Sequence, residues 1–282
     1  MRYGGFLLLS VFAVASHLGA QPAAIDIVRR SLDRDWTDFE KSKNYTYREK
    51  TEVRRYGKNS KLTNSESETH EVLILAGRPY QKLIERDGNA LSEKEAAKEQ
   101  RAQDKELAKR QGRSPSERAH DEKERAEKRR YLNEIPDAFT FQMVATENVS
   151  GQPAWVIDAQ PRPGWRAKYS RAKMFSRVSA RIWIEQTTYR WVKVDAKVLD
   201  TLSFGLGVLR IAPGGTIHVE QAHINNEVWL PSAVLVRADA RLALLKKLRA
   251  EIDVQFSDYQ KFQTESRITD FEEQATGDAA PR

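Results

Sequence analysis

Apolar side chains recur at three- and four-residue steps near the start of the chain and at every second position over most of the rest. The first pattern predicts an amphipathic helix over residues 25–43, with an apolar face made of Ile25, Val28, Leu32, Trp36 and Phe39. Another part of the molecule must cover that face.

The second pattern predicts β-strands, because side chains alternate between the two faces of a sheet. It begins at Tyr45 and Tyr47 and returns after residue 138, with a hairpin over 180–198 that bends at residues 186–189. Residues 240–249 suit either a short helix or a hairpin bend. We expect about ten strands in one continuous antiparallel order, over 45–53, 69–76, 80–85, 139–146, 153–160, 180–198, 202–211, 216–224, 228–237 and 252–259.

A charged segment, residues 92–132, interrupts the strands. Residues 93–130 contain thirteen bases and ten acids, and Leu107 is their only large aliphatic side chain. High helix propensity without an apolar stripe predicts a solvated helical hairpin or a mobile insertion. Residues 112–115 would divide two helices, with Ser114 or Ser116 capping the second.

The insertion has a second interpretation, a docking arm for an acidic partner or for nucleic acid. Its basic excess is small, thirteen against ten, and the charges are interleaved. It also offers no aromatic platform on which bases could stack. We therefore expect no nucleic-acid partner.

So many strands with one apolar face must form a sandwich or curl toward a barrel, since a flat open sheet would leave that face wet. The economical solution is a mainly β (α+β) fold. We expect a curved antiparallel sheet that forms an incomplete β-barrel, with the N-terminal helix as a lid and a charged helical insertion.

The first twenty residues differ from the rest. Arg2 precedes an apolar run over residues 6–15, and Ala20 ends a stretch of small residues. This arrangement predicts a signal peptide at 1–20, with a buried N-terminal strand or helix as the alternative. We expect a protein secreted across the inner membrane into the periplasm, with one domain at 21–271 and a disordered C-terminal tail at 272–282.

The 282 residues contain no cysteine. A disulfide scaffold, a thiolate metal site, a cysteine nucleophile and a lipid-anchored lipoprotein all require one, so the sequence excludes them. It also lacks a nucleophile elbow, a phosphate-binding loop and a dinucleotide-binding glycine pattern. We predict no catalytic residue, metal site or cofactor; Asp158 and Asp195, each between apolar neighbours in a strand, remain candidates for an unrecognised hydrolase pair.

Several segments resemble the bacterial lipoprotein-carrier superfamily, the half-barrel proteins of outer-membrane lipoprotein sorting. They are the exported N-terminus, the first helix followed by Tyr45-Thr46-Tyr47, and the turn and strand at 151–157. The hairpin at 181–185 and the late segments 228–231 and 256–259 add to them. The resemblance implies an apolar interior that accepts acyl chains beneath a helical lid. The insertion and the lack of a lipidation cysteine depart from the family pattern, and the second favours a carrier over a membrane-fixed receptor.

A carrier of this kind needs a cavity that hides methylene groups, each of which costs ~0.8 kcal/mol in water. Strand aromatics with few neighbouring charges suit its wall, although the same residues could be ordinary core. The candidate ligand-binding residues are Tyr45, Tyr47, Phe139, Phe141, Trp155, Trp183, Phe204 and Trp229.

The charge balance adds a further candidate surface. With 47 Lys and Arg against 40 Asp and Glu, the formal charge of +7 favours anionic surfaces such as phospholipid headgroups. Basic residues alternate with leucines around residues 241–249, so this segment is either a membrane-contact edge or a solvated loop. The candidate membrane-contact residues are Arg241, Lys246, Lys247 and Arg249.

Together these patterns predict a monomeric, non-enzymatic carrier for an acyl chain, lipid or lipoprotein. An alternative is an envelope interaction or sensor module of the same fold that acts through the charged insertion.

Overall fold

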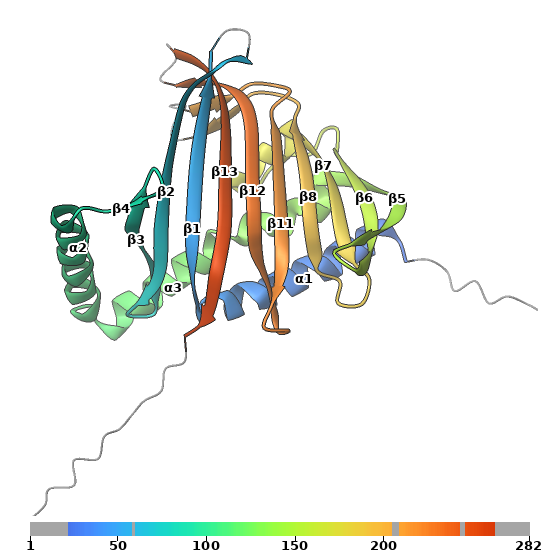
Figure 1. Ribbon diagram of the computed structural model, residues 1–282. Coiled ribbons are helices and arrows are strands. Elements are labelled where there is room, and N and C mark those ends of the chain that lie inside the picture. Colours follow the sequence, from blue (N-terminus) through green and yellow to red (C-terminus); the bar gives the residue numbers. More distant parts are fainter. Residues whose placement is uncertain (1–21, 58–59, 205–208, 243–245, 263–282) are drawn as a thin grey trace, which may run out of the picture.

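The computed structural model describes residues 22–57, 60–204, 209–242 and 246–262 (Figure 1). Its helices are α1 (Ala24–Ser42), α2 (Glu93–Gln111), α3 (Pro115–Glu127) and α4 (Ile135–Ala138), with 3₁₀ segments η2 (Arg130–Glu134) and η3 (Ser170–Arg177). The strands are β1 (Tyr45–Tyr56), β2 (Leu62–Leu75), β3 (Arg78–Arg86), β4 (Asn89–Ala90), β5 (Phe139–Val149), β6 (Gln152–Pro161), β7 (Val178–Glu185), β8 (Trp191–Val198), β9 (Leu202–Phe204), β10 (Leu209–Ile211), β11 (Thr216–Ile224), β12 (Val228–Leu242) and β13 (Lys246–Lys261).

All these strands belong to one antiparallel sheet with the main order β4-β3-β2-β1-β13-β12-β11-β8-β7-β6-β5. Over the described residues its two end strands, β4 and β5, do not pair, so the sheet is an open half-barrel. The predicted fold class is confirmed. The expected continuous strand order is wrong, because the early meander β1–β4 joins the later one through the ladder between β1 and β13.

Two local predictions have different outcomes. Within the segment 240–249, the described residues 240–242 of β12 pair antiparallel with 246–248 of β13, which agrees with the hairpin rather than the helix interpretation. The single strand expected over 202–211 is wrong, because β9 and β10 are two strands that pair with each other antiparallel. Within the described ranges the number of strands is therefore thirteen rather than about ten.

Helix α1 lies across one face of the sheet, which we call the inner face (Figure 1). Ile27 and Val28, 0% and 3% exposed, pack there with Trp155, Ile157 and Ile184. Complete burial of such a side chain contributes about 1.5–3 kcal/mol to folding, so the N-terminal half of α1 is firmly anchored.

The buried face of α1 is displaced from the predicted one. It includes Ser31 and Asp38, each about 5% exposed or less, whereas Trp36 is 41% exposed. The assumption that every large apolar residue faces the sheet is wrong at Trp36. Polar residues take part because they find partners: Asp38 accepts hydrogen bonds of 2.6 and 3.1 Å from the Arg190 guanidinium.

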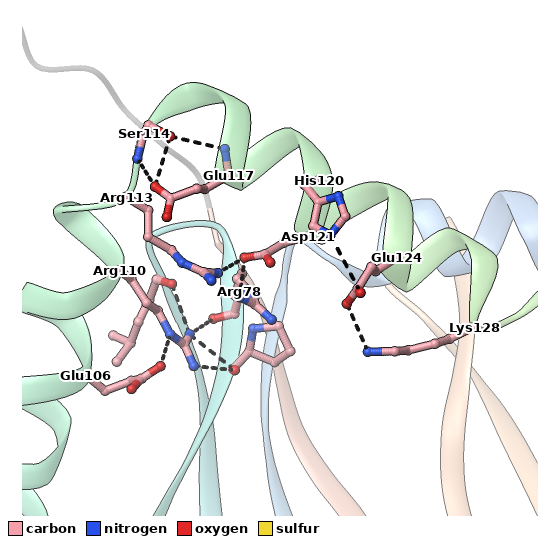
Figure 2. A network of polar contacts seen from close by, with 12 residues as sticks. Arg78, Glu106, Arg110, Arg113, Ser114, Glu117, His120, Asp121, Glu124 and Lys128 are labelled. Carbon is pink, nitrogen blue, oxygen red and sulfur yellow. Dashed lines mark hydrogen bonds and ion pairs between the residues drawn. The ribbon is translucent and has the colours of Figure 1, made fainter.

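The insertion forms the two predicted helices, and Ser114 caps the second through a reciprocal pair of hydrogen bonds with Glu117 (Figure 2). Neither helix has a buried residue. The prediction of a solvated helical hairpin is nevertheless incomplete. Helix α2 lies beside β3, whereas α3 crosses the inner face together with α1 (Figure 1).

A single arginine attaches the end of α2 to the sheet. Arg110, with a side chain 12% exposed, donates from Nη1 to the carbonyls of Leu75, Arg78 and Pro79 at 3.2, 2.9 and 3.3 Å. Nearby, Asp121 of α3 pairs with Arg78 at 2.6 Å and also contacts Arg113 (Figure 2). These contacts position α3 relative to the β2–β3 turn.

We expect Arg110→Met to lower the free energy of unfolding by about 1–3 kcal/mol, because three carbonyls lose a charged donor while the aliphatic stem is kept. Urea denaturation measures this loss, and amide exchange should rise in α2. Arg101→Met is the matched control, since Arg101 is an exposed arginine of the same helix. Equal stability of the two variants would contradict the assigned role.

Candidate ligand-binding cavity

A cavity of about 670 Å³ lies between the inner face of the sheet and the helices that cover it. This volume is within the range of about 300–1,000 Å³ that is typical of small-molecule sites. Its wall is largely aromatic and aliphatic, with contributions from both meanders of the sheet. Representative wall residues are Tyr47, Phe141, Phe175, Ile182, Val194 and Phe256.

The structure brings four predicted aromatic residues directly to this wall. Tyr45 and Tyr47 come from β1, and Phe139 and Phe141 come from β5. Each pair is separated by two positions, so alternation along the strand directs both side chains to the same face. They lie on strands far apart in the sheet order and so belong to opposite sides of the cavity.

Of the other predicted aromatic residues, Trp155 and Trp183 lie elsewhere and Trp229 lies at the border of the cavity. Trp155 packs beneath the N-terminal half of α1. Trp183 falls between the wall residues Ile182 and Ile184, so it points to the outer face, where its Nε1 donates to Glu147 at 2.8 Å. Trp229 borders the cavity, but its side chain packs with Trp183 and stacks on His223. The side chain of Phe204 is outside the described residues.

Sequence reasoning missed Phe256 and Tyr259, which both line the cavity although they are three positions apart. A β-bulge explains this. The β1–β13 register shifts between Thr46 and Arg48, and Asp258 opposite has a φ of +54°. The extra residue in β13 returns Tyr259 to the face of Phe256. Regular alternation would predict opposite faces.

Two ion pairs connect α1 to α3 and the residues that follow it. Lys43 Nζ lies 3.2 Å from Glu122, and Arg129 pairs with Asp35, which also accepts a hydrogen bond of 3.0 Å from Trp191 Nε1. The order of these pairs shows that α3 runs antiparallel to α1. The insertion therefore forms part of the cavity's cover, where Arg125, Arg129, Tyr131 and Leu132 line the space. Its composition gave no signal of this role.

Two tyrosines of the cavity wall, Tyr47 and Tyr259, have pKa values above the ordinary tyrosine value. Burial raises the pKa of Tyr47, with a smaller contribution from Glu49, and burial raises the pKa of Tyr259, whose ring centroid is 5.1 Å from that of Tyr47. The folded state thus favours the protonated phenols. Their contribution to stability is complete below about pH 10, the ordinary tyrosine value, and is lost as the pH rises above it.

We therefore expect Tyr47→Phe to weaken the alkaline loss of stability by about 1.4 kcal/mol per pH unit above about pH 10. Unfolding free energies measured on both sides of that pH test the change in slope. Near neutral pH the variant should match the parent, because the Tyr47 hydroxyl has no hydrogen-bond partner among the described residues. Parallel alkaline slopes for the two proteins would refute the expectation.

The candidate membrane-contact residues lie at the β12–β13 hairpin. The side chains of Arg241, Lys246 and Lys247 fall outside the described residues. Arg249 is exposed and donates to Asp239 at 2.9 Å and to Ser60 at 2.8 Å. A membrane role for this edge remains a proposal.

The candidate hydrolase pair lies away from the cavity. Asp158 and Asp195 are each flanked by inner-face residues, so they occupy the outer face, on either side of Arg181 in the strand register. Arg181 binds Asp158 through two hydrogen bonds of 2.6 and 2.9 Å and lowers the pKa of that carboxyl. Asp195 contacts His218. These arrangements account for both acids as ion-pairing residues.

Across the described ranges, no group of three or more histidine and acidic side chains is arranged to hold a metal ion. None of the helices in the described part of the chain combines the length and apolar character of a membrane span.

No family model and no curated protein matches the sequence. Among solved structures, an outer-membrane lipoprotein-sorting protein domain from Vibrio parahaemolyticus has a TM-score of 0.35 at 10% identity, covering 89% of this chain and 97% of that one. A LolA superfamily protein from Nitrosomonas europaea has a TM-score of 0.30 at 10% identity, covering 86% and 94%. The MucA/MucB complex of Pseudomonas aeruginosa has a TM-score of 0.24 at 10% identity, covering 85% and 99%. The chain is structurally similar to lipoprotein-sorting and LolA superfamily proteins, at low TM-scores.

Proposed function

We propose that the protein is a non-enzymatic carrier that holds the acyl chain of a lipid or lipoprotein in the inner-face cavity. The observation that carries the proposal is the cavity itself, a space of about 670 Å³ with a mainly apolar wall. A folded protein fills comparable interior space with side chains unless the space has a use, because packing is otherwise close.

The energetics favour such a ligand. Each methylene removed from water contributes ~0.8 kcal/mol, so burial of about ten would contribute roughly 8 kcal/mol before the costs of association. Aromatic rings from β1, β5 and β13 provide contact area at a small entropic cost. Release then requires the cover to move, and the side formed by α1 and α3 is joined by ion pairs rather than by a continuous apolar core.

The proposal includes a location and a chain organisation. We propose residues 1–20 as a signal peptide for secretion into the periplasm, followed by a single domain and a C-terminal tail. The carrier would act as a monomer that exchanges its ligand with an acylated donor.

Native mass spectrometry of the purified protein tests the proposal directly. Co-purification of a lipid, or saturable binding of a fatty acid with a fluorescent label, is the expected result. An empty protein that does not bind the labelled fatty acid would contradict it. If that protein instead bound a defined envelope partner, and deletion of α2 abolished the binding, the interaction-module alternative would replace the carrier.

A further inference from the structure

The charged residues beside the cavity are not distributed at random. Glu122, Arg125 and Arg129 follow one another at steps of three and four residues, which puts them on one side of α3 and its continuation. Glu122 and Arg129 meet α1 in the two ion pairs already described. Arg125 lies between them and lines the cavity.

The acids at this end of the cavity already have cationic partners. Asp35 binds Arg129, Asp38 binds Arg190, and Glu40 and Glu122 bind Lys43. Arg125 is half-buried, yet it makes no ion pair or hydrogen bond with any residue in the described ranges. Of the four cations, Lys43, Arg125, Arg129 and Arg190, only Arg125 therefore has no direct ion-pair partner among the described residues.

Arg129 also lines the cavity, one helical turn after Arg125, but the protein itself occupies its guanidinium. Its Nη2 contacts Asp35 and its guanidinium lies 4.3 Å from the centroid of the Phe39 ring, but its buried Nε has no acceptor among the described residues. The guanidinium that is free to bind a ligand at this wall is therefore that of Arg125. A guanidinium pairs best with a planar or tetrahedral anion that accepts two hydrogen bonds, such as a carboxylate or a phosphate.

The rest of the wall is mainly apolar, with Phe139, Phe175, Val178 and Ile182 contributed by β5, η3 and β7. A ligand that satisfies both parts has an anionic headgroup and a hydrocarbon tail. We propose that the cavity selects amphiphiles with a carboxylate or phosphate headgroup, which Arg125 binds at the junction of α1 and α3. This inference rests on the proposed function for the binding of the tail and adds the selection of the headgroup.

The test compares laurate, dodecyl phosphate and dodecanol, which share one chain length and differ in the headgroup. Displacement of a fluorescent probe from the full chain gives each affinity. We expect the two anionic ligands to bind about 10- to 100-fold more tightly than dodecanol, the range for a hydrogen-bonded charged pair. The stronger of the two identifies the headgroup as carboxylate or phosphate.

Arg125→Gln should remove this preference and leave the affinity for dodecanol unchanged, whereas Arg125→Lys should retain part of it. Arg118→Gln is the matched control, because it removes the same charge from an exposed position of α3. Circular dichroism verifies that each variant is folded. A preference that survives in Arg125→Gln, or equal binding of dodecanol and laurate by the parent, would overturn the inference alone. Failure of all three ligands to bind would overturn the proposed function as well.

Discussion

Replacement of Ala196 by phenylalanine is expected to weaken acyl-chain binding about 50-fold without unfolding the protein. Ala196 of β8 and its cross-strand neighbour Ala180 of β7 both line the cavity. A ring at either position would occupy space that the chain needs. Exclusion of about three methylenes costs roughly 2.4 kcal/mol, and 1.4 kcal/mol corresponds to a factor of ten.

The neighbouring residue supplies the control for this experiment. Lys197 follows Ala196 in β8 and points to the opposite, outer face, so Lys197→Phe adds the same ring to the same strand without entering the cavity. Titration with a labelled fatty acid should show parent-like binding for Lys197→Phe and weak binding for Ala196→Phe. Ala180→Phe should reproduce the loss. Equal affinities for the two phenylalanine variants of β8 would mean that the ligand binds elsewhere.

The strand pattern was sufficient to predict the fold class because one apolar face, repeated over many strands, has few ways to be buried. It also located the aromatic residues of β1 and β5, where alternation is regular. It failed at β13, where the bulge at Asp258 changes the phase, and no local sequence signal marks a bulge at an aspartate. The pairing between β1 and β13, which joins the two meanders, is likewise a long-range contact that local sequence patterns do not predict.

The helices that cover the cavity were harder to predict from the sequence than the strands that form its wall. The face of α1 that meets the sheet includes an acid, Asp38, and α3 contributes Arg125 from a segment whose composition indicates only solvation. The sequence around a charged residue does not reveal its ion-pair partner when that partner is distant along the chain, as Arg190 is from Asp38. The same limit applies to Arg125, whose lack of a partner becomes visible only when every nearby ion pair is known.

The ion pair between Asp38 and Arg190 leads to the largest expected effect on stability. The two side chains are 7% and 16% exposed, and the pair connects the C-terminal half of α1 to the residue before β8. Asp38→Ala should lower the free energy of unfolding by about 3–5 kcal/mol, because it leaves a largely enclosed guanidinium without its counter-charge. Urea denaturation measures the loss. Asp33→Ala, an exposed aspartate of the same helix, should change stability by no more than about 0.5 kcal/mol.

A double variant separates the cost of the unpaired charge from the value of the contact. Asp38→Leu combined with Arg190→Met replaces the pair by apolar side chains and should recover most of the stability that Asp38→Ala loses. If the double variant were as unstable as Asp38→Ala, the pair would be an attachment that apolar packing cannot replace. If Asp38→Ala matched Asp33→Ala, the C-terminal half of α1 would depend on its apolar contacts alone. Amide exchange in α1 distinguishes local release of the helix from global unfolding, because only local release would raise exchange in α1 while β6 and β7 stay protected.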